Sequence, residues 1–163
     1  MKVPSQRSFS LRPAVLIAVL LLLVSSEATA ATWKGIEPLK SRRADVEKIL
    51  GESISQNPNG PLVFKVLGGT VSVSFVDANF VRTKKLMPEL EGTVLQIILQ
   101  HENSSDTPES LNLSKNRDFD REEAKNAVIF RNLKDGIVYT FILGNLKTTR
   151  YTFSENQISR ARH

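Results

Sequence analysis

The sequence predicts an α+β domain in which one short helix packs on an antiparallel sheet of about five or six strands. Three observations support this fold class. One segment has the apolar spacing of a helix, several later segments alternate apolar and polar residues as half-buried strands do, and turn residues link these strands into hairpins. The chain has 163 residues, which is enough for one hydrophobic core after an N-terminal leader is removed.

Residues 1–30 have the three parts of a cleavable signal peptide. The positively charged start contains Lys2, Arg7 and Arg12. An apolar run of 11 residues follows over Ala14–Val24, and Ala28-Thr29-Ala30 provides the small residues that a signal peptidase reads. Such a run is too short to cross a hydrocarbon core of about 30 Å comfortably as a helix. We therefore expect an exported protein, periplasmic or extracellular, that begins near Ala31; an uncleaved membrane anchor is the alternative.

Composition excludes several classes of protein. Cysteine is absent, so disulfides, thiolate metal sites, thiol nucleophiles and a lipid anchor on an N-terminal cysteine are excluded. The net charge is +5, and +3 remains when the leader's three basic residues and one acidic residue are removed. A charge of this size supports solubility and does not indicate a nucleic-acid partner. No apolar run after the leader is long enough for a transmembrane anchor.

Ser41–Leu50 is the clearest helix. Ser41 is a suitable N-cap, because its hydroxyl can accept a hydrogen bond from the first turn. The apolar stripe consists of Val46, Ile49 and Leu50. Gly51 follows directly and can adopt the left-handed conformation that ends a helix. We expect the stripe to be buried against the sheet.

Six segments have the pattern of strands. They are 62–67, 70–76, 93–100, 127–133, 136–142 and 147–153. Gly68-Gly69 joins the first two into a hairpin, and Lys134-Asp135 with Gly136 joins the fourth and fifth. The stretches 63–75 and 129–141 align without gaps at a spacing of 66 residues. A duplicated helix-plus-hairpin unit explains this match, as does the general similarity of amphipathic hairpins.

The remaining segments are polar. We expect 77–92 to be an exposed crossing loop, 101–116 to be a loop, and 120–126 to form one or two helical turns. Residues 154–163 are predicted to be a flexible basic tail after a single domain over 31–153.

Alternation assigns the strand residues to two faces. The core face should contain Val71, Val73, Phe75, Ile137, Tyr139 and Phe141, packed under the first helix. The opposite face should present Ser72, Ser74, Val138, Thr140, Arg150 and Thr152. These residues predict a polar, nearly flat surface that suits another protein better than a small molecule.

The sequence shows no recognisable catalytic or cofactor-binding motif. His101 and His163 are the only histidines, and no nucleophile motif accompanies them. The acidic series Asn116, Asp118 and Asp120 lacks the glycine that a calcium loop needs at its sixth position, where Arg121 stands. We therefore expect no enzyme, no metal and no cofactor.

A second candidate for partner binding lies in the segment 80–90, which combines apolar and basic side chains. The candidate residues are Phe80, Arg82, Lys84, Lys85 and Met87. Apolar and basic side chains on a loop are common anchors at interfaces. The alternative is that Phe80 and Leu86 belong to the core and only the charged residues are exposed.

The stretch Pro38–Gly51 (PLKSRRADVEKILG) resembles the start of the SmpA/OmlA domain, the BamE-like family of small bacterial envelope proteins. Ala44-Asp45-Val46 and Ile49-Leu50-Gly51 stand at its motif positions. Trp33-Lys34-Gly35-Ile36 and the later Asp135-Gly136-Ile137 also resemble a set of uncharacterised exported bacterial proteins.

The resemblance implies a non-catalytic protein that binds or helps to assemble other envelope proteins. The fold is also similar to the scaffold of β-lactamase inhibitory proteins, which implies an alternative, an inhibitor of a secreted or periplasmic hydrolase. The chain departs from both groups, because it has no cysteine for a lipid anchor or a disulfide. A third hypothesis, an enzyme that uses Asp118, Asp120 and Glu122, has no motif behind it.

Overall fold

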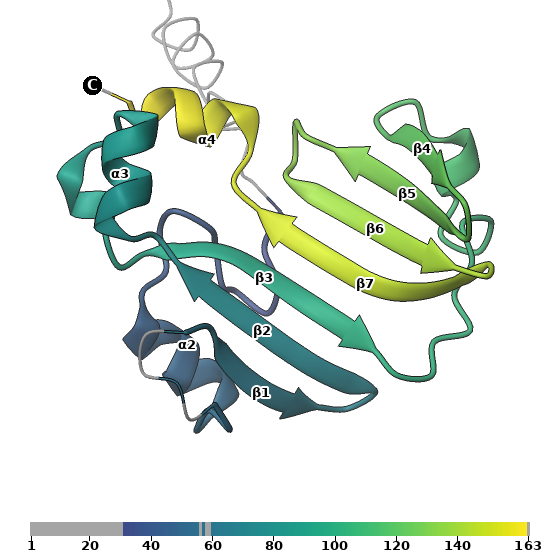
Figure 1. Cartoon of the computed structure of the whole chain (residues 1–163), viewed down its shortest axis with the longest axis horizontal. Helices are drawn as coiled ribbons and strands as arrows, with labels where there is room; N and C mark the ends of the chain where they lie inside the picture. Colours follow the sequence, from purple (N-terminus) through teal and green to yellow (C-terminus); the bar gives the residue numbers. More distant parts are fainter. Residues whose placement is uncertain (1–30, 56, 58–59, 163) are drawn as a thin grey trace, which may run out of the picture.

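The computed structural model describes residues 31–55, 57 and 60–162, and the predicted signal peptide lies outside them. One antiparallel sheet of seven strands forms the body of the protein, in the order β1-β2-β3-β7-β6-β5-β4 (Figure 1). The α+β class is confirmed, with more strands than expected. The strands are β1 (Leu62–Val66), β2 (Gly69–Phe75), β3 (Val94–His101), β4 (Asp120–Ala124), β5 (Ala127–Asn132), β6 (Ile137–Ile142) and β7 (Asn145–Thr152).

The six predicted strands are all present, and β4 is the additional one. The expectation of helical turns over 120–126 is wrong. All five residues of β4 are exposed, and they show no apolar alternation that would identify a strand. Pairing with β5 and the Glu122–Arg131 ion pair, 2.8 Å long, hold this charged edge strand in place.

The predicted first helix is α2 (Arg43–Leu50), and it begins two residues later than expected. The Ser41 hydroxyl accepts from the backbone N–H of Glu37 at 2.9 Å instead of capping the helix. Arg42 is the N-cap residue, and its backbone N–H donates to Asp45 Oδ2 at 2.8 Å. Gly51 ends the helix as predicted, at a positive φ of 84°, but its ψ of −153° lies outside the left-handed helical conformation that was expected.

Two of the three stripe residues pack as predicted. Val46 is fully buried and Leu50 packs against the same cluster, together with residues of β1, β2 and β3. Ile49 is 43% exposed, so its assignment to the buried stripe is wrong. An eight-residue helix lying on the edge half of a sheet buries only a narrow stripe, and Ile49 falls beside it.

The core lies on one face of the sheet, and strand register confirms which residues point into it. Val71 and Val73 share this face with Leu99 and Ile97, and Tyr151 continues it across the central strands. The first helix covers only the β1–β3 half, contrary to expectation. Over the other half, Leu111, Leu113 and Phe119 pack on the side chains of Phe130, Phe141 and Tyr139.

Two short helices stand at one end of the sheet, where loops were expected (Figure 1). Helix α3 spans Ala78–Lys84 and is capped by Asp77, whose carboxylate accepts from Phe80 N–H at 2.6 Å. Helix α4 spans Glu155–Arg160 within the predicted flexible tail, and Ser154 caps it. Neither helix is long enough to show a helical period. Leu86 and Ala161, both buried, hold them together in one cluster with Val76 and Leu39.

Short 3-10 turns occur at Pro88–Leu90 (η2) and Leu113–Lys115 (η3). Within the described part of the chain, no helix has the length and apolar character needed to cross a bilayer.

The two stretches that align at a spacing of 66 residues form the hairpins β1-β2 and β5-β6, and each hairpin continues into a three-stranded meander. Strands β1-β2-β3 form one and β5-β6-β7 the other, and they meet where β3 pairs with β7. Phe64 and Phe130 are buried at matching positions. The expected helix of the second unit is not found: where α2 precedes β1, strand β4 precedes β5. The match therefore extends to the strands alone.

Candidate binding face

The face of the sheet opposite the core, here called the open face, presents a row of side chains across the strands. Ser72, Ile98, Arg150, Val138 and Arg131 follow one another from β2 to β5 in direct register. A parallel row contains Thr70, Gln100, Thr148, Thr140 and Ile129. Register thus confirms that Ser72, Val138, Thr140 and Arg150 share the face that their alternation predicted.

Arg150 lies at the centre of the open face on β7. Its direct neighbours on β3 and β6 are Ile98 and Val138, both apolar. The Nε atom is buried and has no hydrogen-bond partner, and no described acidic residue forms an ion pair with Arg150. The Nε of Arg131 is also buried without a hydrogen-bond partner, but the guanidinium of Arg131 forms an ion pair with Glu122 at 2.8 Å. Arg150 is therefore a cationic group whose donors are left for something outside the chain.

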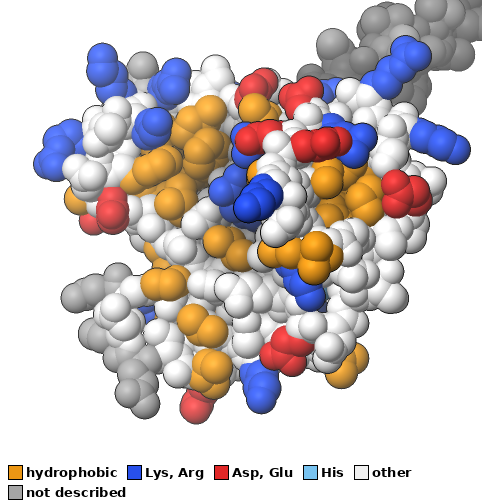
Figure 2. All heavy atoms as spheres, turned by 45° about the vertical axis from the view of Figure 1, so that its right-hand side comes forward, with side chains coloured by type: hydrophobic (Ala, Val, Ile, Leu, Met, Phe, Trp, Pro, Cys, Tyr) orange, Lys and Arg blue, Asp and Glu red, His pale blue; other side chains and the backbone are white. Residues whose placement is uncertain are grey.

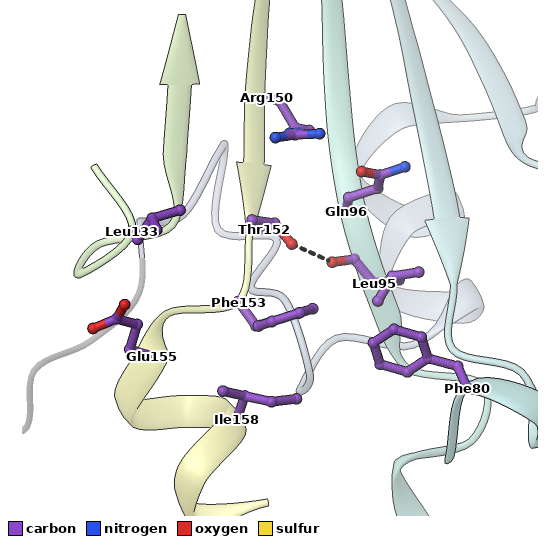
Figure 3. A pocket seen from close by; sticks show the side chains of 9 residues that line it. All are labelled: Phe80, Leu95, Gln96, Leu133, Arg150, Thr152, Phe153, Glu155 and Ile158. Carbon is purple, nitrogen blue, oxygen red and sulfur yellow. Dashed lines mark hydrogen bonds between the residues drawn. The ribbon is translucent and has the colours of Figure 1, made fainter. Parts of the chain in front are cut away.

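An apolar hollow with a volume of about 440 Å³ opens beside Arg150, at the end of the sheet that α3 and α4 flank. The residues around it are Phe80, Leu95, Gln96, Leu133, Arg150, Thr152, Phe153, Glu155 and Ile158 (Figure 3). Phe80 from α3 packs on Phe153 with ring centroids 6.0 Å apart. Thr152 donates from Oγ1 to the carbonyl of Leu95 at 3.2 Å, which ties β7 to β3 at the base of the hollow.

A second hollow of about 300 Å³ lies on the other side of Arg150. Its walls are Ile98, Ile129, Arg131, Val138, Thr140, Thr148 and Arg150. The expectation of a nearly flat surface is therefore wrong, since the two hollows meet at Arg150. Figure 2 shows basic side chains in the middle of the molecule, with hydrophobic groups on either side.

Of the predicted partner-binding residues, the structure brings only Phe80 into this site. Arg82, Lys84 and Lys85 are exposed on α3 and its C-cap, and Met87 is half-buried after it. Leu86 is fully buried, so the core alternative holds for Leu86. The basic side chains of α3 lie outside the lining of the hollow.

The acidic residues considered for catalysis do not converge. Glu122 is engaged by Arg131, and neither Asp118 nor Asp120 lines either hollow of the open face. Within residues 31–55, 57 and 60–162, no group of three or more histidine and acidic side chains is placed to hold a metal ion.

Comparison of the chain with protein-family models, curated proteins and solved structures finds no match. The BamE-like resemblance of residues 38–51 therefore stays a prediction.

Sequence reasoning missed most of the hollow. Alternation along β7 identified Arg150, but Gln96, Leu95 and Ile158 were not considered. Leu95 lies where β2 and β3 shift register between Ser74 and Phe75, and a bulge of this kind leaves no mark in an apolar run. Ile158 belongs to the helix that was expected to be a tail. The one available signal in the sequence was the alternation of Arg150 and Thr152 with Tyr151 and Phe153, which places Arg150 on the face opposite the core.

His101 is half-buried on the core face, with Nε2 3.0 Å from Thr149 Oγ1. Burial lowers the pKa of His101 from its ordinary value of 6.5, and Asp106 opposes this shift. Because the unfolded chain then binds a proton at higher pH than the folded chain, stability is expected to fall as the pH drops through about 6.5. The loss ends below the folded-state pKa.

This expectation is measured as the melting temperature of the wild type and of His101→Gln between pH 8 and pH 5. The glutamine variant should show a smaller decrease between pH 7 and pH 5. Equal pH profiles for the two proteins would contradict the lowered pKa.

Proposed function

We propose that the mature chain is an exported, non-catalytic protein of the bacterial cell envelope that binds another protein through the open face. The observation that carries this proposal is Arg150, a central arginine whose buried Nε has no hydrogen-bond partner and whose guanidinium forms no ion pair with the described residues. A buried donor without a hydrogen bond costs free energy, typically about 1–3 kcal/mol. An acceptor on a bound partner would reach the terminal N–H groups of the Arg150 guanidinium and would offset part of this cost.

The rest of the open face suits a protein surface. Its Ser, Thr and Gln side chains are exposed or half-exposed donors and acceptors, and arginine flanked by apolar groups is typical of residues that dominate interface energies. Export rests on the leader sequence, and the envelope assignment rests on the resemblance of residues 38–51.

The second candidate is an inhibitor of a secreted hydrolase. The two meanders favour it, because they place both hollows on one continuous face that an enzyme's rim can meet. An inhibitor should form a one-to-one complex with the hydrolase and abolish its activity, whereas an assembly protein should leave the partner active.

The test is capture of partners from envelope extract by wild-type protein and by Arg150→Glu. A partner of the open face should be retained by wild type and lost by Arg150→Glu, because charge reversal at a central interface arginine typically costs about 2–5 kcal/mol of binding. Lys48→Glu is the matched control, since Lys48 is exposed on α2, which packs on the core face. Equal melting temperatures of the three proteins show that the variants fold.

Retention of the same partner by Arg150→Glu would show that the open face is not the interface. Loss of the partner with Lys48→Glu alone would show the same. The bait is produced from its full-length gene in a bacterial host and sequenced at its N-terminus, which should begin at or within two residues of Ala31. A start at Met1 would contradict export.

A further inference from the structure

We propose that Arg150 and the apolar hollow together form a subsite for a peptide carboxylate that adjoins a large apolar side chain. This inference rests on the proposed function and names the chemistry of the partner's segment. Two features carry it: a pair of hydrogen-bond donors without partners, and an apolar cavity directly beside them.

The donors are the guanidinium of Arg150 and the side-chain amide of Gln96. They project from the adjacent strands β7 and β3 into the same hollow, with Gln96 directly opposite Thr152 and Arg150 two residues before Thr152 on β7 (Figure 3). Gln96 makes no side-chain hydrogen bond with the described residues, and the Nε of Arg150 has none either. Guanidinium presents parallel N–H donors that match the two oxygens of a carboxylate. A carboxylate bound by Arg150 can also accept from Gln96 when the side-chain amide turns its nitrogen toward Arg150, because Figure 3 shows the amide oxygen on that side.

The apolar half of the subsite is formed by Phe80, Leu95, Phe153 and Ile158, which converge from α3, β3, the end of β7 and α4 (Figure 3). The hollow, about 440 Å³, lies in the lower part of the range of about 300–1,000 Å³ typical of ligand sites. It therefore suits a group of the size of a leucine or phenylalanine side chain with its backbone.

The surroundings favour a peptide over a fatty acid. Beyond the hollow, the polar side chains of Ser72, Ser74, Gln100, Thr140 and Thr148 surround the apolar residues Ile98, Ile129 and Val138 on the open face. A long acyl chain crossing these side chains would desolvate them without offering hydrogen bonds, which is costly. A peptide backbone offers both donors and acceptors. Glu155 at the edge of the hollow also disfavours a doubly charged group such as a phosphate.

Short peptides test the subsite without the partner. The probes are N-acetyl-glycyl-phenylalanine, its C-terminal amide, N-acetyl-aspartyl-phenylalaninamide, N-acetyl-glycyl-glycine and octanoate. Binding is followed by the NMR signal of the Arg150 Nε–Hε group. At least one of the two probes with both a carboxylate and a phenyl group should shift this signal, and the uncharged amide should bind at least about tenfold more weakly.

The two peptides that carry both a carboxylate and a phenyl group distinguish the source of the carboxylate. Preference for N-acetyl-glycyl-phenylalanine supports recognition of a C-terminus, and preference for the aspartyl peptide supports an acidic side chain within a chain. N-acetyl-glycyl-glycine should bind weakly, because it leaves the apolar half empty.

Variants test each half separately. Arg150→Gln should remove the preference for the acid over the amide, as followed by the side-chain NMR signal of Gln96. Leu133→Ser should weaken every phenyl-bearing probe with little loss of stability, since Leu133 is 51% exposed at the rim. Arg117→Gln is the control, because Arg117 is exposed outside the hollow.

Equal binding of acid and amide would overturn the proposal, as would tighter binding of octanoate than of either acidic peptide. The peptide-binding test and the partner-capture test can give different results, so failure of the subsite is distinguishable from failure of the proposed function. If Arg150→Glu abolishes capture of the partner while neither acidic peptide binds, the carboxylate subsite is wrong and the binding face stands.

Discussion

Replacement of Gly136 by alanine is expected to destabilise the protein by about 3 kcal/mol or more. Gly136 has a φ of 74°, a conformation that side chains rarely adopt. A Cβ added there would also collide with the backbone carbonyl of Thr152 and approach that of Phe153 to 2.9 Å. The backbone cannot move aside freely, because Thr152 N–H donates to the carbonyl of Gly136 at 2.8 Å.

Gly144→Ala is the matched control for this prediction. Gly144 has a similar φ of 82°, but a Cβ there would meet nothing within 4 Å. Its substitution should lower stability only by the cost of holding an alanine at a positive φ, about 1–2 kcal/mol. Chemical denaturation of both variants measures the difference. Similar losses of stability in Gly136→Ala and Gly144→Ala would show that the backbone of β7 leaves room for a side chain at Gly136.

Because Thr152 and Phe153 line the apolar hollow, Gly136→Ala is also expected to weaken binding at the open face. Gly144→Ala should leave this binding unchanged.

Truncation of Phe141 to alanine is expected to cost about 3–5 kcal/mol, a large part of a typical total of about 5–15 kcal/mol. Phe141 is 1% exposed. Its ring meets that of Phe130 edge-on, with centroids 5.9 Å apart, and Leu113 and Leu146 close the same cluster. The segment 106–119 has no other cluster to hold it, so its amides should lose protection from hydrogen exchange in this variant.

Ile142→Ala is the neighbouring control. Ile142 is 40% exposed, so its truncation should lower the free energy of unfolding by much less than truncation of Phe141. A melting temperature for Phe141→Ala within a few degrees of the wild type would show that the second half of the sheet does not depend on this cluster.

Local pattern was sufficient for much of the sheet. Six strands alternate or are rich in β-branched residues, and the side chains of Val71, Val73 and Tyr139 point to the core face as their period of two predicted. Any tertiary arrangement that buries one face of a strand requires the same alternation of apolar and polar residues. The alternation could therefore be recognised in the sequence without knowledge of the fold. The position of Arg150 on the opposite face follows from the same argument.

Tertiary packing decided the rest. Strand β4 is charged and lies at an edge, so pairing with β5 alone makes it a strand. Helices α3 and α4 are too short to form stably in isolation, and they exist because Leu86 and Ala161 are buried together at the end of the sheet.

The candidate site is also a product of packing. The cavity beside Arg150 requires Phe80, Leu95 and Ile158 to converge from three elements distant in sequence. Alternation along the strands thus determined which face carries Arg150 and the Ser and Thr rows. The hollow arose only when α3 and α4 packed at the end of that face, because contacts between distant elements leave no periodic signal in the sequence.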